Sequence, residues 1–189
     1  HLSLRRQRQM CIRDRNYTAN STLGAVDAYV VASGAVATLT SAQATGQAIS
    51  GDGGLTVTGL AADANLGSVS AAGTVTANVA TSLDYSSNAN LAVVDTFVIA
   101  DSVTGSFSAA QGANTITLGS GSVAKVIVAS EDISGTSLSA SVTAIDVSDN
   151  ETAILSAAQA QLTVALGTSA VAQMRVSTTT DVSSSTLDS

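Results

Sequence analysis

The chain has 189 residues and a formal charge of −7, only 11% of its side chains are charged, and it holds no Pro and no Trp. Strong acidity with few bases argues against a nucleic-acid partner, which needs clustered Lys and Arg, and disfavours an anionic membrane surface. No apolar run approaches the roughly 18 residues of a membrane-spanning helix. We therefore expect neither a nucleic-acid partner nor membrane insertion.

Residues 1–15 differ in composition from everything that follows. They hold five of the seven basic residues, the only His and the only Cys. The run "RRQRQMCIRD" at 5–14 resembles, codon for codon, the translation of a transposase-type sequencing adapter. On this reading residues 1–15 are an adapter-derived artefact, expected to be disordered and excluded from fold reasoning, and the native protein is expected to extend further. Residues 16–189 then carry two bases against 13 acids, a formal charge of −11.

Residues 16–93 are interpreted as diverged N-terminal repeats. "VDAYVVAS" at 26–33 matches "VDTFVIAD" at 94–101, and "TSAQ" at 40–43 follows it as "SAAQ" follows the later copy. A second early match sets "ADANLGSVSAAG" at 62–73 over "ADSVTGSFSAAQ" at 100–111. The uneven spacing of these copies indicates divergence or insertions.

The clearest repeat sets residues 99–130 over 147–178, at an offset of 48 without a gap and with 12 of 32 positions identical. This predicts one repeat unit over 94–141 and a second over 142–189. The Ser/Thr-rich end of the second unit is read as a truncated copy, with a flexible linker as the alternative. The shared positions include Asp101/Asp149, Ser108–Gln111/Ser156–Gln159 and Leu118–Gly119/Leu166–Gly167.

Within a unit, short β-branched runs such as "VVDTFVIAD", "NTITLGSG" and "VAKVIVAS" predict strands bounded by Gly, Asn, Asp and Ser turns. In the second unit Ser148 and Glu151 have capping-box spacing, which predicts a short helix with Ile154, Leu155, Ala158 and Leu162 on one face. About 48 residues are too few for an immunoglobulin-like sandwich of about 100. The predicted fold is mainly β, a set of parallel β-solenoid-like repeats with short helical turns; an α/β solenoid or a β-sandwich is the alternative.

The phrases "VSDNETAILSAAQ" and "IADSVTGSFSAAQ" resemble the Ala/Ser/Thr/Asp-rich repeats of giant bacterial cell-surface and adhesin-like proteins. The resemblance covers roughly residues 26–189 and implies an extracellular or cell-surface location. It also implies a structural or adhesive role, and it transfers no catalytic residue.

Catalysis is poorly supported by the residues themselves. Outside residues 1–15 there is no His or Cys, so Ser-His-Asp and Cys-His arrangements have no members. A carboxylate pair, Asp146 with Asp149 or Glu131 with Asp132, is the remaining enzymatic option. The Asp149 position recurs as Asp101 and Asp63, which favours a turn or cap over one active site, so the chain is predicted not to be an enzyme.

Calcium is the one cofactor that the sequence suggests. The stretch "DVSDNE" supplies hard oxygen ligands close together, and the alternative is a solvated turn with a helix cap. The predicted metal ligands are Asp146, Asp149, Asn150 and Glu151.

The functional expectation is a segment of a large secreted bacterial surface protein that acts as a rigid spacer or multivalent contact surface. Its expected partners are neighbouring repeats of the same longer chain and cell-surface or extracellular polysaccharide. The alternatives are a calcium-dependent carbohydrate-binding module and a carbohydrate-active β-helix enzyme. The aromatic residues distinguish a spacer from these carbohydrate-related alternatives. In a sugar-binding protein the rings of Tyr29, Tyr85 and Phe97 would line a groove, and in a spacer they would lie in the core.

Overall fold

The computed structural model describes residues 9–12, 15–20 and 26–176. Over these residues the chain is mainly β, and its parallel sheets form a β-solenoid of about 8 turns. The chain divides into two compact units, the first comprising residues 1–80 and 88–98 and the second residues 81–87 and 99–189. The prediction of a mainly β, parallel solenoid with short helical turns is confirmed.

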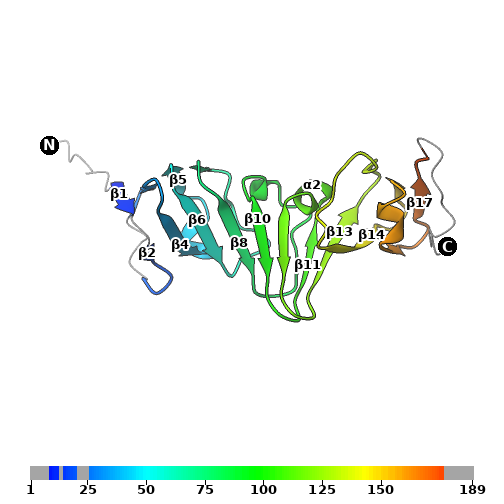
Figure 1. The fold of residues 1–189 in the computed structure, drawn as a ribbon, viewed down its shortest axis with the longest axis horizontal. Helices are drawn as coiled ribbons and strands as arrows, with labels where there is room; N and C mark the ends of the chain where they lie inside the picture. Colours follow the sequence, from blue (N-terminus) through cyan, green and yellow to red (C-terminus); the bar gives the residue numbers. More distant parts are fainter. Residues whose placement is uncertain (1–8, 13–14, 21–25, 177–189) are drawn as a thin grey trace. The chain divides into compact units, whose positions relative to one another are not determined.

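The first unit contains strands of two parallel sheets, which alternate along the chain from β1 to β8. One sheet has the order β1 (Gln9–Ile12), β3 (Ala28–Val31), β5 (Ala48–Gly51) and β7 (Val69–Ala71). The other sheet runs through β2 (Arg15–Asn16), β4 (Val36–Thr40), β6 (Gly54–Thr58), β8 (Val75–Val79) and β10 (Thr96–Ile99). Strands β4, β6 and β8 lie side by side in Figure 1. Two short helices, α1 (Ser41–Ala44) and η2 (Ala89–Leu91), interrupt the coils.

The second unit repeats this plan. Its larger sheet has the order β16 (Thr163–Leu166), β14 (Val142–Val147), β13 (Val123–Val128), β11 (Thr104–Phe107) and β9 (Leu83–Asp84). Strands β15 (Thr152–Leu155) and β17 (Val171–Met174) form a smaller parallel sheet. The remaining elements are β12 (Thr115–Leu118), α2 (Ala109–Gly112) and η3 (Gln159–Gln161).

The core of each unit is built from columns of apolar side chains in register. In the first unit Tyr29 pairs with Ile49, which pairs with Val69, and all three are buried. In the second unit Phe107 pairs with Val126, which pairs with Ile145. Burying one such side chain contributes about 1.5–3 kcal/mol. Because the chain has few large residues, stacking them in columns gives each a large neighbour above and below.

The 48-residue repeat is visible in the strands. Moving 48 positions along the chain carries β11 onto β15 and β12 onto β16 with identical bounds, and it places α2 over η3. The early match of 26–33 to 94–101 also holds, because β3, β4 and α1 follow one another as β10, β11 and α2 do. The match of 62–73 to 100–111 does not hold. Ser70 lies in β7, whereas its aligned residue Ser108 caps α2.

One local prediction is wrong. The helix expected to start at Ser148 is replaced by a turn, closed by Glu151 N–H donating to the Ser148 carbonyl, and then by β15. Ile154 and Leu155 therefore alternate in a strand, with Leu155 buried. The helical turn begins after Ser156, eight residues later, because parallel pairing of β15 with β17 stabilises the extended conformation.

Residues 9–12, which belong to the segment expected to be disordered, form β1 and pair in parallel with β3. The rest of the adapter-like segment, 1–8 and 13–14, lies outside the described residues. Most of the Ser/Thr-rich end, residues 177–189, also lies outside them.

Candidate functional site

The "SAAQ"-type corners share one hydrogen-bond arrangement. The backbone N–H of Gln111 donates to the Ser108 hydroxyl at 3.2 Å, and the Ser108 N–H donates to the Gln111 side-chain oxygen at 2.9 Å. The same reciprocal capping box joins Thr40 with Gln43 and Ser156 with Gln159. Each box starts a helical turn immediately after a strand, so the Gln side chain is fixed at the corner of its coil.

Each Gln then reaches back to the preceding coil. Gln159 Nε2 donates to the carbonyls of Ile133 at 2.8 Å and Thr136 at 2.9 Å. Gln111 Nε2 donates to the Tyr85 carbonyl at 3.0 Å. We call each such amide, bonded to carbonyls of the preceding coil, a cross-coil clamp. Gln111 and Gln159 are buried, so these bonds form away from solvent.

The first unit carries two further clamps. Gln43 Nε2 donates to the carbonyls of Tyr17 and Asn20, both at 2.9 Å. Asn88 Nδ2 donates to the carbonyls of Ala62 and Ala64 at 2.8 and 2.9 Å. The clamps span 23 to 26 residues of sequence. They satisfy carbonyls at corners where no strand ladder continues.

The recurring Asp residues make a second type of contact between coils. Asp101 Oδ1 accepts a hydrogen bond from Ser120 N–H at 2.7 Å, and Asp149 Oδ1 accepts one from Thr168 N–H at 2.6 Å. In both cases the acceptor lies 19 residues before the donor. Asp63, aligned with them by the early match, instead lies exposed in a turn. The turn role predicted for Asp101 and Asp149 therefore includes holding the next coil.

The four predicted calcium ligands do not converge. Asp146 pairs with Lys125, Oδ2 to Nζ at 2.5 Å, and the Glu151 carboxylate accepts from the Ser130 hydroxyl. Asn150 forms the turn with a φ of 59° and donates its N–H to the Thr168 carbonyl. Within the described part of the chain, no three Asp, Glu, His or Cys side chains lie close enough to hold a metal ion. In the described structure Asp146, Asp149 and Glu151 each have a different partner.

The carboxylate pair Glu131 and Asp132 lies at an exposed turn. Asp132 Oδ1 accepts from the Ser134 hydroxyl at 2.6 Å and from its N–H at 3.1 Å, and Oδ2 pairs with Arg175. The hydrogen bonds from Ser134 and the nearby Arg175 charge lower the pKa of Asp132. A general acid needs a raised pKa, so this environment suits a turn residue better than a proton donor.

The aromatic side chains lie in the core. Tyr29, Tyr85 and Phe97 are at most 1% exposed, and the rings of Tyr85 and Phe107 stack with centroids 5.8 Å apart. These rings therefore offer no platform on the surface for stacking against a sugar.

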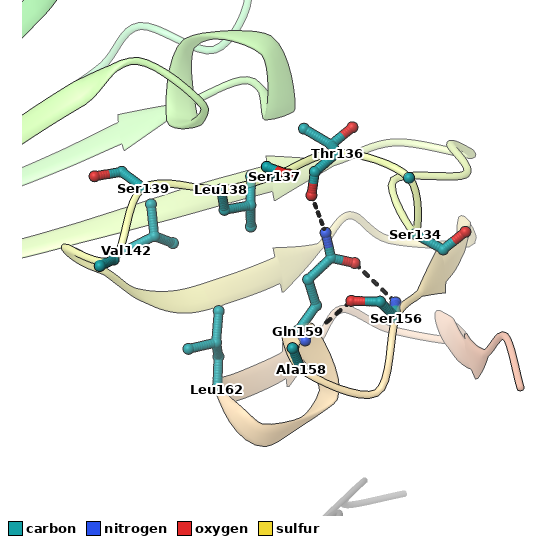
Figure 2. A pocket seen from close by; sticks show the side chains of 12 residues that line it. Ser134, Thr136, Ser137, Leu138, Ser139, Val142, Ser156, Ala158, Gln159 and Leu162 are labelled. Carbon is teal, nitrogen blue, oxygen red and sulfur yellow. Dashed lines mark hydrogen bonds between the residues drawn. The ribbon is translucent and has the colours of Figure 1, made fainter. Parts of the chain in front are cut away.

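A pocket of about 440 Å³ lies between the 134–142 segment and η3. Figure 2 shows Leu138 and Val142 on one side and Leu162 on the other, with the amide of Gln159 hydrogen-bonded to Thr136 and Ser156 beside them. None of the residues that line it, all between 134 and 162, is charged. Its hydroxyl-bearing lining residues are Ser134, Thr136, Ser137, Ser139 and Ser156.

One outward face of the first unit is a regular array of Thr. Thr38, Thr56 and Thr76 are register partners on β4, β6 and β8, and Thr40 is the partner of Thr58. These side chains alternate with buried residues along each strand and are half-buried. This face presents neutral hydroxyl and methyl groups at the spacing of the strands.

Compared with protein-family models, with curated proteins and with solved structures, the chain gives no match. Among the described residues, no helix has both the length and the apolar character needed to cross a membrane.

The sequence does not predict the clamps. The run "SAAQ" repeats along the chain, but its pattern names no partner for the Gln side chain. The available signal was a Gln at a fixed distance of three after Ser or Thr, directly following a strand. The partner carbonyls carry no sequence signature, because any residue supplies one.

Proposed function

We propose that the chain is a structural and adhesive repeat segment of a large secreted bacterial surface protein, in which stacked coils act as a rigid spacer. The observation that carries this proposal is the recurrence of one clamp, Gln43, Gln111 and Gln159, at equivalent corners. A side chain repeated in this way serves every coil equally, whereas a catalytic site needs one set of residues in one place.

The spacer role is supported by the number of different contacts between coils that would resist a pulling force along the chain. Adjacent coils are joined by ladder hydrogen bonds, by the clamps and by the Asp101 and Asp149 contacts. In repeat proteins stability is a sum of unit and neighbour terms. Neighbouring repeats of the same longer chain are therefore the primary partner in this proposal.

The adhesive component rests on the neutral, hydroxyl-rich surface. Thr38, Thr56 and Thr76 repeat one chemical group from coil to coil, so a repetitive ligand such as an extracellular polysaccharide would make many weak contacts that add by avidity. The Asp contacts described above favour this reading over a calcium-dependent carbohydrate-binding module, because these carboxylates already serve backbone and side-chain donors. No cofactor and no catalytic step enter the proposal.

Single-molecule pulling of the full chain between two handle domains tests the spacer role. We expect discrete rupture events, because each unit is a cooperative stack of coils. A smooth extension with no rupture event, as for a flexible linker, would remove the basis for a load-bearing role.

A further inference from the structure

We propose that the pocket between the 134–142 segment and η3 is a binding site for a neutral pyranose, such as one residue of an uncharged polysaccharide. This inference deepens the proposed function, since it names what the adhesive surface contacts. The pocket volume of about 440 Å³ falls within the range of small-molecule sites, roughly 300–1,000 Å³.

The polar lining suits a ligand made of hydroxyl groups. Ser156 Oγ accepts from Gln159 N–H at 3.3 Å and Ser139 Oγ accepts from Ser141 N–H at 3.4 Å. In both cases the bond uses an acceptor position, so the hydroxyl hydrogen is directed elsewhere. Ser134 Oγ donates to Asp132 and keeps its acceptor positions. A hydroxyl both donates and accepts, so the pocket matches a partner that does both.

Charge narrows the ligand class. The lining residues include no Lys, Arg, Asp or Glu, so a carboxylate or ammonium group in this pocket would lose water without gaining a counter-charge, which is costly. The Gln159 amide is committed to the clamp, its oxygen to Ser156 N–H and both of its hydrogens to carbonyls. It therefore forms a fixed inner wall and leaves recognition to the hydroxyls.

The apolar side explains why a sugar ring fits better than a small polyol. Leu138, Val142 and Leu162 face the same space (Figure 2). A pyranose has a C–H face and a rim of hydroxyls, so its face can cover these side chains while its rim reaches the Ser and Thr groups. Without an aromatic ring in the lining, we expect each contact to be weak, in the millimolar range.

The pocket is lined by the end of the 94–141 unit and by the 142–189 unit, and one lining residue, Ser139, differs from its counterpart 48 positions earlier. Val94 N–H donates to the Leu91 carbonyl at 3.0 Å, and 48 positions later Val142 N–H donates to the Ser139 carbonyl at 3.0 Å. Leu91 and Ser139 therefore occupy equivalent positions, three residues before Val94 and Val142. Leu91 is fully buried, whereas Ser139 is half-buried on the pocket wall. The shorter Ser139 side chain leaves more room at this wall than a Leu side chain would.

The test is an NMR titration of the full ¹⁵N-labelled chain with methyl glucoside, methyl galactoside and N-acetylglucosamine, with glucuronate as the charged comparator. We expect saturable shifts at amides of residues 134–142 and 156–162 for at least one neutral sugar, and weaker shifts for glucuronate. Absence of saturable shifts for all three neutral sugars would overturn the proposal, as would a preference for glucuronate.

Two variants locate the site. Ala158 is exposed and lines the pocket, so Ala158→Phe should block it and abolish the shifts. Its counterpart Ala110 is exposed in α2, so Ala110→Phe is the matched control and should bind as the parent does. Equal binding by both variants would place the sugar elsewhere and contradict the proposal.

A milder variant tests the site independently in case Ala158→Phe does not fold. Thr136→Val with Ser137→Ala removes two hydroxyls and leaves the Thr136 carbonyl in its clamp. It should weaken sugar binding at least several-fold, and unchanged affinity would contradict the assigned contacts. Mechanical rupture of these variants should match the parent, so failure of the sugar site is distinguishable from failure of the spacer role.

Discussion

At the scale of single residues, the side-chain amide of Gln159 satisfies two carbonyls that the strand ladders leave over. Removing it would leave the Thr136 carbonyl without this donor and would take one of two donors from the buried Ile133 carbonyl, which keeps its bond from Thr136 N–H. A buried acceptor left without a partner costs about 1–3 kcal/mol. The clamps therefore stabilise the fold in two ways: they give hydrogen-bond donors to backbone carbonyls, and they hold neighbouring coils together.

The variant Gln159→Met keeps the side-chain length and removes both the donors and the acceptor. We expect its free energy of unfolding to fall by about 1–3 kcal/mol, measured by urea denaturation. Gln161→Met, in the same 3-10 turn but exposed, is the control and should change stability by less than about 0.5 kcal/mol. Equal effects of the two substitutions would contradict the clamp.

The buried Tyr85 side chain should make the free energy of unfolding depend on pH in the alkaline range. Burial raises the pKa of Tyr85 from 10.0 to about 12, so the folded state holds its proton more tightly than the unfolded state. The stabilisation that protonated Tyr85 gives to the folded state is complete below pH 10 and is lost as the pH rises towards about 12. Two pKa units correspond to about 3 kcal/mol.

The check is a series of urea denaturations between pH 9 and pH 12, on the parent and on Tyr85→Phe. The variant should lose less stability than the parent over this range. Because burial also raises the pKa of Tyr29, a smaller alkaline loss should persist in Tyr85→Phe. Parallel pH profiles for the two proteins would refute the assignment.

At the scale of elements, strands were predictable and corners were less so. The runs of Val, Ile and Thr between Gly and Asp turns predict β10, β12 and β13, since these residues suit a pleated surface, whereas the run that contains β11 has no clear pattern. Ser148 and Glu151 match a capping box and predict a helix from Ser148 through Leu162, yet its first half is a turn and β15. Parallel pairing with β17 decides that segment, and this pairing involves residues distant in sequence that no local pattern reveals.

Gly119 shows how closely neighbouring coils approach at a turn. A Cβ at this position would lie 2.5 Å from Asp101 Oδ1 and 2.6 Å from the Asp101 nitrogen. Gly119→Ala should therefore destabilise the fold by about 1–3 kcal/mol through overpacking, measured by thermal or urea unfolding. Gly135→Ala is the control, because a Cβ there meets nothing within 4 Å. A Gly119→Ala protein as stable as the parent would show that these coils separate easily.

The candidate site was predictable only in part. The sequence singled out Asp101 and Asp149 as recurring turn residues, and the structure gives both a partner in the next coil. It also placed Asp146, Asp149, Asn150 and Glu151 in one calcium site. Alternation along β14 and the turn at Asn150 instead direct these residues to separate partners. The calcium site therefore stays a prediction, which the comparison of calcium with chelator tests.

At the scale of the whole molecule, calcium provides a simple test of what holds the coils. The clamps and Asp contacts need no ion, so the melting temperature by circular dichroism should be the same in calcium and in a chelator. A sharp rise in calcium would restore Asp146, Asp149, Asn150 and Glu151 as metal ligands and favour a calcium-dependent module.

Load-bearing by stacked coils is the central claim, and one pulling experiment tests it most directly. The double variant Gln111→Met with Gln159→Met removes the two clamps of the second unit and leaves Gln43 and Asn88 in the first. Compared with Gln161→Met, the double variant should show one rupture event at lower force and the other unchanged. Two unchanged rupture forces would contradict the claim that side-chain clamps carry load between coils.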